Sequence, residues 1–313
     1  MDDITIEGWP DRGFLATHWP QLGTIHLAQI NGGGLRLDTE AGFVHLKKRP
    51  RTSIQAETWI LEQLTEQGVP VPDLVPTATG AKHVMFGHEA VLVYAELPGA
   101  AWGDYTAPDA GANMRKLGAA AASLHLAMAE IDVTGALARG LHVRQRRRGT
   151  EGLPVQIIHR DYHAGNVLFD GEVVTGYIDS DHLELGPRWV DPLYGSLSGM
   201  ARLFEVGREA EWLPLFEEMV AGYHAVSPVT PLEAERTVEL MIGIEEDFLA
   251  WFLRDQDEQN ALLTVLMIER VHRQRDEINE AVARAMNRCP ARIGGWIPRS
   301  ALSASAASSA SSV

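Results

Sequence analysis

Residues 159–169, HRDYHAGNVLF, and residues 176–181, GYIDSD, decide how the rest of this 313-residue chain is interpreted. Apolar runs in and around these two segments predict three short strands: Val155–His159, Val167–Phe169 and Val173–Ile178. Asp170-Gly171, between the second and third runs, is a strong signal for a tight hairpin turn. We therefore expect a strand, a polar loop and then a β-hairpin.

Three oxygen-bearing side chains stand at fixed spacings here: Asp161 after the first strand, Asn166 five positions later and Asp179 thirteen positions after that. Phosphoryl transfer requires positioning and charge neutralisation more than covalent work. Asp161 can orient an acceptor hydroxyl and take its proton, while Asn166 and Asp179 offer the hard oxygen ligands that Mg²⁺ prefers. The spacing predicts a phosphotransferase centre with Asp161 as the catalytic residue. We expect His159 to brace the loop.

These motifs resemble those of the aminoglycoside phosphotransferase and choline kinase-like superfamily, which has the protein-kinase-like fold. The resemblance covers about residues 24–200, and the helical remainder more loosely. Asp161 matches the family's catalytic aspartate, and Asn166 and Asp179 match its magnesium ligands. Residues 191–194, DPLY, match the family's Asp-Pro-x-Tyr. An aspartate often follows that tyrosine in the family, where this chain has Gly195, a departure expected to affect a structural brace and not the chemistry.

The resemblance implies an α+β, bilobal fold with ATP and Mg²⁺ as cofactors. A small N-lobe, an antiparallel sheet with one main helix, is expected over residues 1–94, and a hinge over 95–99. A larger, mostly helical C-lobe follows over 100–299. Residues 300–313, almost entirely Ser and Ala, predict a disordered tail. In the C-lobe we expect helices over about 114–129, from Thr230 to about Arg254, and from Asp257 to about Met286.

The N-lobe offers candidate nucleotide-binding residues. Residues 24–48 predict three strands, with a turn at Gly32, Gly33 and Gly34. These glycines could let backbone N–H groups close over phosphates, although a glycine run is also an ordinary hairpin turn. Lys47, on the third strand, is expected to reach the ATP phosphates. Glu57, on a helix over about residues 53–67, is expected to hold that lysine.

Residues 94–99, YAELPG, resemble the hinge between the two lobes of the family. At this position the carbonyl group of Ala95 and the amide group of Leu97 would pair with adenine. This places the expected nucleotide site between the sheet and the catalytic segment.

Composition limits the partners of the chain. The formal net charge is -15, from 42 acidic and 27 basic residues. This balance argues against nucleic acid, which is bound by surplus Lys and Arg, and is compatible with a cationic acceptor. The single cysteine, Cys289, excludes an internal disulfide. With no visible secretory signal and no apolar run near the ~20 residues that span a bilayer, we expect a cytoplasmic protein without a membrane partner.

The acceptor is less well determined than the donor. Acidic residues at 245–247 and 255–258 lie on late helices, where relatives bind their acceptor, although exposed helix faces are commonly acidic. Trp251 and Phe252 could cage a cation, but such aromatics are commonly core residues. The run Arg144–Arg148 is interpreted as a solvated loop, with an anionic or peptidic partner as the alternative.

Three functions remain open. The first is a small-molecule kinase acting on an aminoglycoside-like antibiotic, a choline-like alcohol or an amino alcohol. The second is a kinase-like enzyme that phosphorylates Ser or Thr of a peptide in a biosynthetic pathway, without a recognisable activation segment. The third, a pseudokinase scaffold that binds nucleotide, is disfavoured because Lys47, Asp161, Asn166 and Asp179 are all present.

Overall fold

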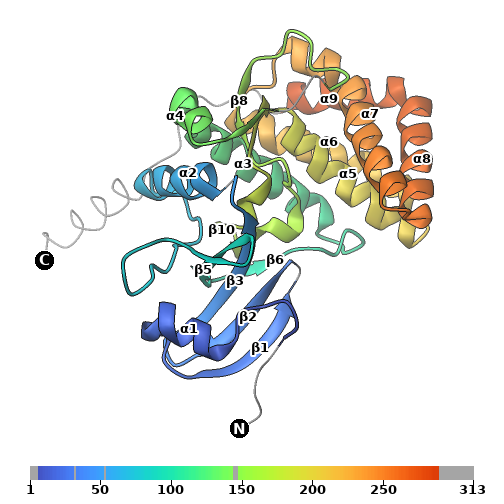
Figure 1. The fold of residues 1–313 in the computed structure, drawn as a ribbon. Helices are drawn as coiled ribbons and strands as arrows, with labels where there is room; N and C mark the ends of the chain where they lie inside the picture. The colour runs from blue at the N-terminus through green and yellow to red at the C-terminus, as the bar shows by residue number, and fades with distance from the viewer. Residues whose placement is uncertain (1–5, 32, 53, 144–146, 289–313) are drawn as a thin grey trace, which may run out of the picture.

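A five-stranded antiparallel sheet forms the first lobe of the chain (Figure 1). The computed structural model describes residues 6–31, 33–52, 54–143 and 147–288. The strands lie in the order β1-β2-β3-β5-β4, with these bounds: β1 (Ile25–Asn31), β2 (Gly34–Thr39), β3 (Gly42–Pro50), β4 (Val84–Phe86) and β5 (Glu89–Ala95). Four predicted features fall wholly or partly outside the described residues: Gly32, the helix start at Ser53, Arg144–Arg146 and the tail at 300–313.

The alternation of β3 gives the sheet two different faces. Val44 and Leu46 are buried in a core with Leu15 of α1 (Arg12–His18), a short helix that the sequence reasoning did not predict. Lys47 and Arg49 point to the other side, because successive strand residues face opposite sides of a sheet. That other side faces the second lobe, so β3 delivers its cationic side chains to the space between the lobes.

The helix expected after β3 is present as α2 (Ile54–Glu66). Its buried stripe, which includes Ile60 and Leu64, packs in the same core as Leu92 of β5. The chain then leaves α2 through Gly68, whose φ of 79° is accessible to glycine at little cost. Burial of this stripe fixes α2 against the sheet, and with it the position of Glu57.

The predicted strands of the catalytic segment are β8 (Val155–Ile158), β9 (Val167–Asp170) and β10 (Val173–Tyr177). The hairpin forms as expected, with Asp170 opposite Val173. Short strands extend these pairings: β6 (Ala100–Ala101) beside β9, and β7 (His142–Val143) and β8 on either side of β11 (Glu184–Pro187). Single 3₁₀ turns occur at η1 (Pro20–Leu22), η2 (Ala164–Asn166), η3 (Ser180–His182) and η4 (Glu209–Glu211).

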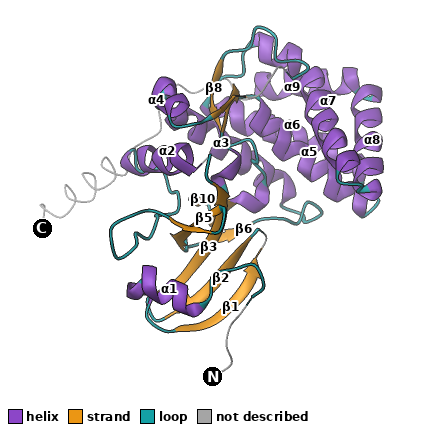
Figure 2. Cartoon of the chain, viewed as in Figure 1, coloured by secondary structure: helices purple, strands orange, loops and turns teal. Residues whose placement is uncertain are grey.

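Helices make up most of the second lobe, as the secondary-structure colouring shows (Figure 2). They are α3 (Ala110–Ala129), α4 (Val133–Ala138), α5 (Val190–Glu205), α6 (Trp212–Val226), α7 (Pro231–Arg254), α8 (Glu258–Arg273) and α9 (Arg275–Arg288). The helix expected from Thr230 is present as α7, and a capping box between Thr230 and Glu233 starts it. The α+β, two-lobed fold class is thereby confirmed. Across the described ranges, no helix has the length and apolar character needed to cross a membrane.

The single helix expected over residues 257–286 is instead two helices. The chain turns at Gln274, so that α8 packs against α7 while α9 packs against α6. The sequence has no Gly or Pro at this turn. The break follows from the two packing partners, which local sequence signals do not contain.

The helices α3 and α6 approach each other through two glycines. A Cβ atom added at Gly118 would lie 2.1 Å from the carbonyl oxygen of Met219, and one at Gly222 would lie 1.9 Å from that of Arg115. Backbone therefore packs against backbone at this crossing. The contact supports the lobe directly behind the catalytic segment, because the Tyr162 hydroxyl donates to the Leu117 carbonyl oxygen at 2.7 Å.

Candidate active site

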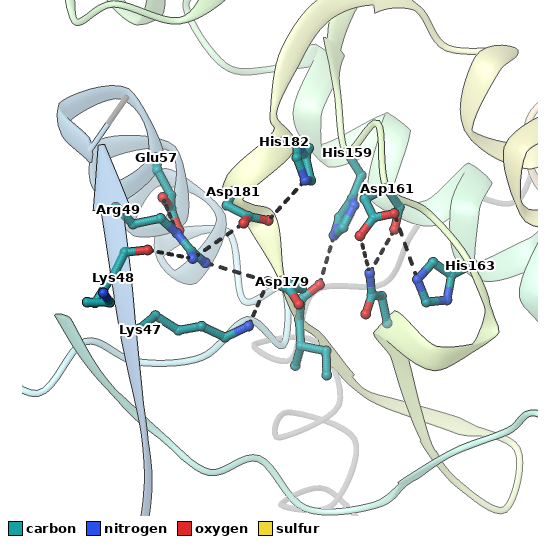
Figure 3. A network of polar contacts seen from close by, with 12 residues as sticks. Lys47, Lys48, Arg49, Glu57, His159, Asp161, His163, Asp179, Asp181 and His182 are labelled. Atoms are coloured by element: carbon teal, nitrogen blue, oxygen red, sulfur yellow. Dashed lines mark hydrogen bonds and ion pairs between the residues drawn. The ribbon is translucent and has the colours of Figure 1, made fainter. Parts of the chain in front are cut away.

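Asp161 lies in the loop after β8 (Figure 3). Hydrogen bonds hold both of its carboxylate oxygens. The Asn166 side-chain amide donates to Oδ2 at 2.9 Å, and the Tyr194 hydroxyl donates to Oδ1 at 2.5 Å. Asn166 also donates to the Asp161 main-chain oxygen, which closes the loop on itself. The carboxylate is thus fixed in one orientation, as a group that must align an acceptor hydroxyl requires.

Asp191 holds the backbone of the loop that follows β8. Its Oδ2 and Oδ1 accept the main-chain N–H groups of His159 and Arg160, each at 2.8 Å, and the His125 side chain also contacts Oδ2 at 2.8 Å. Burial would raise the pKa of Asp191, but the hydrogen bonds and the charges of the two histidines hold it below its ordinary value. These contacts stabilise the left-handed backbone of Arg160, with a φ of 72°.

Two further residues, His159 and Gly195, contact segments that surround the catalytic loop. The His159 ring contacts the Ile178 carbonyl oxygen at 3.0 Å, which ties the catalytic loop to the end of β10. At Gly195 a Cβ atom would lie 3.0 Å from the Tyr162 carbonyl oxygen and 3.1 Å from Cε of Met219. A larger side chain at this position would need its neighbours to move, and the brace of the loop in this chain is Asp191.

Asp179 follows β10 in a left-handed conformation, with a φ of 62°. Its Oδ1 lies 2.8 Å from Nζ of Lys47 and 3.5 Å from Nη2 of Arg49, so an ion pair joins the two lobes (Figure 3). Burial raises the pKa of Asp179, but the nearby cations more than compensate and hold it below its ordinary value. The carboxylate is therefore ionised at neutral pH.

Glu57 does not form the expected pair with Lys47. Its carboxylate accepts from Nε of Arg49 at 3.2 Å and from the Tyr94 hydroxyl at 2.8 Å. Lys47 and Arg49 share a face of β3, and Arg49 is the one that reaches α2, which leaves Lys47 to Asp179. Burial raises the pKa of Glu57 in spite of the Arg49 charge.

Arg49, Tyr94 and Asp181 were missed by the sequence reasoning. Arg49 also contacts Oδ2 of Asp181 at 3.3 Å, so one guanidinium group faces Glu57, Asp179 and Asp181 together. The alternation that separates Lys47 from Lys48 also places Arg49 on the cleft side, and this signal was available in the sequence. Lys48 lies on the opposite face and pairs with Glu89 at 2.7 Å.

A cavity of about 470 Å³ lies between the sheet and the catalytic segment. Among the residues that line it are six of the sequence-predicted ones: Lys47, Glu57, Ala95, Leu97, Asn166 and Asp179. Gly33 and Gly34 do not line it, and Asn31 does. At Gly34 a Cβ atom would lie 2.8 Å from the Leu46 carbonyl oxygen, so glycine is needed there for strand packing.

A divalent cation could be held by Asn166 and Asp179 together with phosphate oxygens. The described residues contain no group of three or more His, Cys, Asp or Glu suited to a metal ion. Mg²⁺ commonly uses one or two protein oxygens beside substrate phosphates, so this pair suits that mode. Asn166 already uses its amide nitrogen toward Asp161, which leaves its amide oxygen as the cation-binding atom.

The acidic residues expected to meet the acceptor do not share one environment. Arg148 pairs with Glu246 at 3.0 Å, and Arg147 pairs with Asp247 at 2.7 Å. Arg147 is buried. Within the described part of the run, both arginines pair with α7. The interpretation as a solvated loop is wrong for Arg147, whereas the side chain of Arg148 is 40% exposed and agrees with it. Glu245 is buried and lines a cavity between α5, α7 and α8.

The sequence pattern of the phosphotransferase enzyme family matches residues 134–234. This segment is therefore similar to that family. The match contains the catalytic loop, the β9–β10 hairpin and the Asp-Pro-x-Tyr motif. It confirms the superfamily and the enzyme class that the sequence predicted, a phosphotransferase with an alcohol group as acceptor. No curated protein matches the sequence.

Solved structures of small-molecule kinases share the fold. The amicoumacin kinase hAmiN, solved with AMP-PNP and Ca²⁺, is 14% identical with a TM-score of 0.61, covering 85% of this chain and 91% of that one. An aminoglycoside phosphotransferase from Alicyclobacillus acidocaldarius is 14% identical, with a TM-score of 0.61 and coverages of 91% and 98%. A microcompartment-associated aminopropanol kinase is 17% identical, with a TM-score of 0.60 and coverages of 82% and 93%. These likenesses confirm the protein-kinase-like fold.

Proposed function

We propose that this protein transfers the γ-phosphoryl group of Mg-ATP to a hydroxyl group of a small, amine-bearing acceptor. The observation that carries the proposal is the position of Asn166. Its side chain lines the cleft between the lobes and also holds the carboxylate of Asp161. A nucleotide in that cleft would therefore contact the side chain that holds Asp161, the group that orients the acceptor.

The residues have distinct roles in this reaction. Asp161, held by Asn166 and Tyr194, accepts the proton of the acceptor hydroxyl as the new P–O bond forms. Asn166 and Asp179 would hold Mg²⁺, which neutralises charge on the triphosphate. Nζ of Lys47 donates a hydrogen bond to Asp179. The side chain is long enough to contact a phosphate oxygen in place of Asp179. Arg49 keeps Glu57 and α2 in place.

We assign binding of the adenine base to residues 95–99, the segment that joins the two lobes. Ala95, the last residue of β5, and Leu97 both line the cleft, as the hinge hypothesis requires. Support for a nucleotide and a divalent cation also comes from the amicoumacin kinase of the same fold, which was solved with AMP-PNP and Ca²⁺. Support for a small acceptor comes from the kinases of this fold, which include an aminopropanol kinase.

Two variants separate nucleotide binding from transfer. Mg-ATP at about 100 times its Kd should stabilise the wild-type protein by about 2.7 kcal/mol. Asp161→Asn should keep this stabilisation in a thermal-shift assay while phosphate transfer falls by at least about a hundredfold. Asp179→Ala should lose the stabilisation. Normal transfer by Asp161→Asn contradicts the catalytic assignment, and a wild-type protein that binds Mg-ATP without transfer to any hydroxyl compound would favour a scaffold.

A further inference from the structure

A second cavity, of about 400 Å³, lies between α5, α7 and α8. It shares no lining residue with the nucleotide cleft. Tyr194 belongs to its wall, and the Tyr194 hydroxyl donates to Asp161 at 2.5 Å. Tyr194 therefore connects the wall of this cavity to the carboxylate of Asp161.

The wall of this cavity combines an apolar part with polar and charged side chains. Six side chains supply the apolar part: Leu197, Ala201, Phe248, Phe252, Leu263 and Met267. The rings of Phe248 and Phe252 lie nearly parallel, with centroids 6.0 Å apart, and Phe248 also contacts the ring of Tyr194 at 5.5 Å. Such a surface buries hydrocarbon, and its aromatic faces attract a cation.

Glu245 of α7 differs from the other charged residues of this wall. It is only 3% exposed, and no hydrogen bond or ion pair of its side chain occurs among the described residues. Burial raises the pKa of its carboxyl group to about 8. A buried carboxyl group without a partner is unfavourable for folding, and such groups concentrate where a ligand supplies the partner.

The other charged groups of the cavity do not satisfy Glu245. The titratable groups that line it are Tyr194, Arg202 and Glu205, all from α5, and Arg202 lies 3.0 Å from Glu205. The α8 side contributes Asn260 and Thr264, which are neutral. One unmatched carboxyl group therefore faces the cavity from α7.

We propose that the acceptor is a monoamine with an apolar body, whose ammonium group pairs with Glu245 while its hydroxyl group reaches Asp161 beside Tyr194. The hydroxyl part of this assignment rests on the proposed function. A polyamine such as an aminoglycoside requires several free carboxylates, whereas this cavity offers one unmatched carboxyl group, beside the rings of Phe248 and Phe252. Phe248 and Phe252 accommodate the hydrocarbon body.

Acceptor binding is coupled to a proton. In the free protein at pH 7, Glu245 is mostly protonated because its pKa is about 8. Pairing with an ammonium group favours the carboxylate, so the carboxyl proton leaves to the buffer as the ion pair forms. The amine is already protonated in solution. Binding should therefore release up to about one proton per ligand.

Calorimetry with a matched pair of probes tests this proposal without any phosphate transfer. N-benzylethanolamine and its neutral oxygen counterpart, 2-(benzyloxy)ethanol, are titrated into the full chain at pH 7. Each titration is repeated in two buffers of different ionisation enthalpy, which reports proton release. We expect the amine to bind at least about tenfold more tightly than the ether, a difference of about 1.4 kcal/mol, and to release a proton.

Glu245→Gln should remove both the preference for the amine and the proton release. Glu246→Gln is the matched control, because Glu246 is the next residue of α7 but pairs with Arg148. Glu245→Met, of similar volume, repeats the test if the glutamine variant does not fold. Equal binding of the two probes, no binding of either at millimolar concentration, or an amine preference that survives in both variants would overturn the proposal.

The same samples distinguish this inference from the proposed function. If the amine binds through Glu245 but accepts no phosphate from Mg-ATP, the transferase proposal fails and the amine site stands. If phosphate is transferred to kanamycin while the amine shows no preference over the ether, the amine site fails and the transferase proposal stands.

Discussion

Arg49 forms ion pairs with three carboxylates at the cleft between the lobes. Its side chain is 5% exposed and contacts Glu57 at 3.2 Å, Asp181 at 3.3 Å and Asp179 at 3.5 Å. Replacement by methionine keeps most of the side-chain volume but leaves Glu57 buried with only Tyr94 as a partner. Breaking a buried pair from one side costs about 3 kcal/mol or more. We expect Arg49→Met to lower the free energy of unfolding by that amount, measured by urea denaturation.

The neighbouring lysine supplies the control for this prediction. Lys48 lies on the other face of β3, near Trp9, and its partner Glu89 is about half exposed. Exposed pairs contribute up to about 1 kcal/mol, so Lys48→Met should change stability by less than that. Equal losses in the two variants would show that Arg49 is not the anchor of α2.

At the scale of elements, the crossing of α3 and α6 gives a sharp prediction. Gly118→Ala places a methyl group 2.1 Å from the Met219 carbonyl oxygen, so the helices must separate. Overpacking of this kind costs about 1–3 kcal/mol, which should appear as a lower thermal midpoint. Gly111 lies on the same helix, where a Cβ atom meets only Glu218 at 3.7 Å. Gly111→Ala should therefore be neutral or stabilising, by up to about 1 kcal/mol.

The elements that the sequence predicted are those with local signals. The Asp170-Gly171 turn fixes the β9–β10 hairpin, and the capping box at Thr230 fixes the start of α7. The turn at Gln274 and the pairing of Glu57 with Arg49 were not predicted. Both depend on which distant surface the side chain or helix meets, and residue spacing does not encode that contact. The set proposed for catalysis and metal binding, Asp161, Asn166 and Asp179, could be predicted because its spacing is local to one strand, loop and hairpin.

At the scale of the whole molecule, the two lobes meet through opposite charges. Lys47 and Arg49 project from the first lobe, and Asp179 and Asp181 project from the second (Figure 3). A bound triphosphate would place negative charge next to these cations and a metal ion next to Asp179. Nucleotide binding is thus expected to exchange partners within an existing charge network, which limits the rearrangement needed between the lobes.

The stability of the whole chain should depend on Glu245 through pH. The folded-state pKa of this carboxyl group is about 8, above its ordinary value of 4.5, so the folded state retains a proton that the unfolded state loses between these values. Its contribution to stability is therefore full below pH 4.5 and is lost as pH rises toward 8. Between pH 5 and 8 the loss is on the order of 3 kcal/mol.

Glu245→Gln isolates this contribution from the general repulsion that a net charge of -15 produces at high pH. Urea denaturation of both proteins at pH 5 and pH 8 gives four free energies of unfolding. The wild-type protein should lose more stability than the variant over this interval, and the variant should be the more stable of the two at pH 8. Parallel pH profiles would mean that Glu245 ionises freely in the folded chain, and the carboxyl group would then need no ammonium partner.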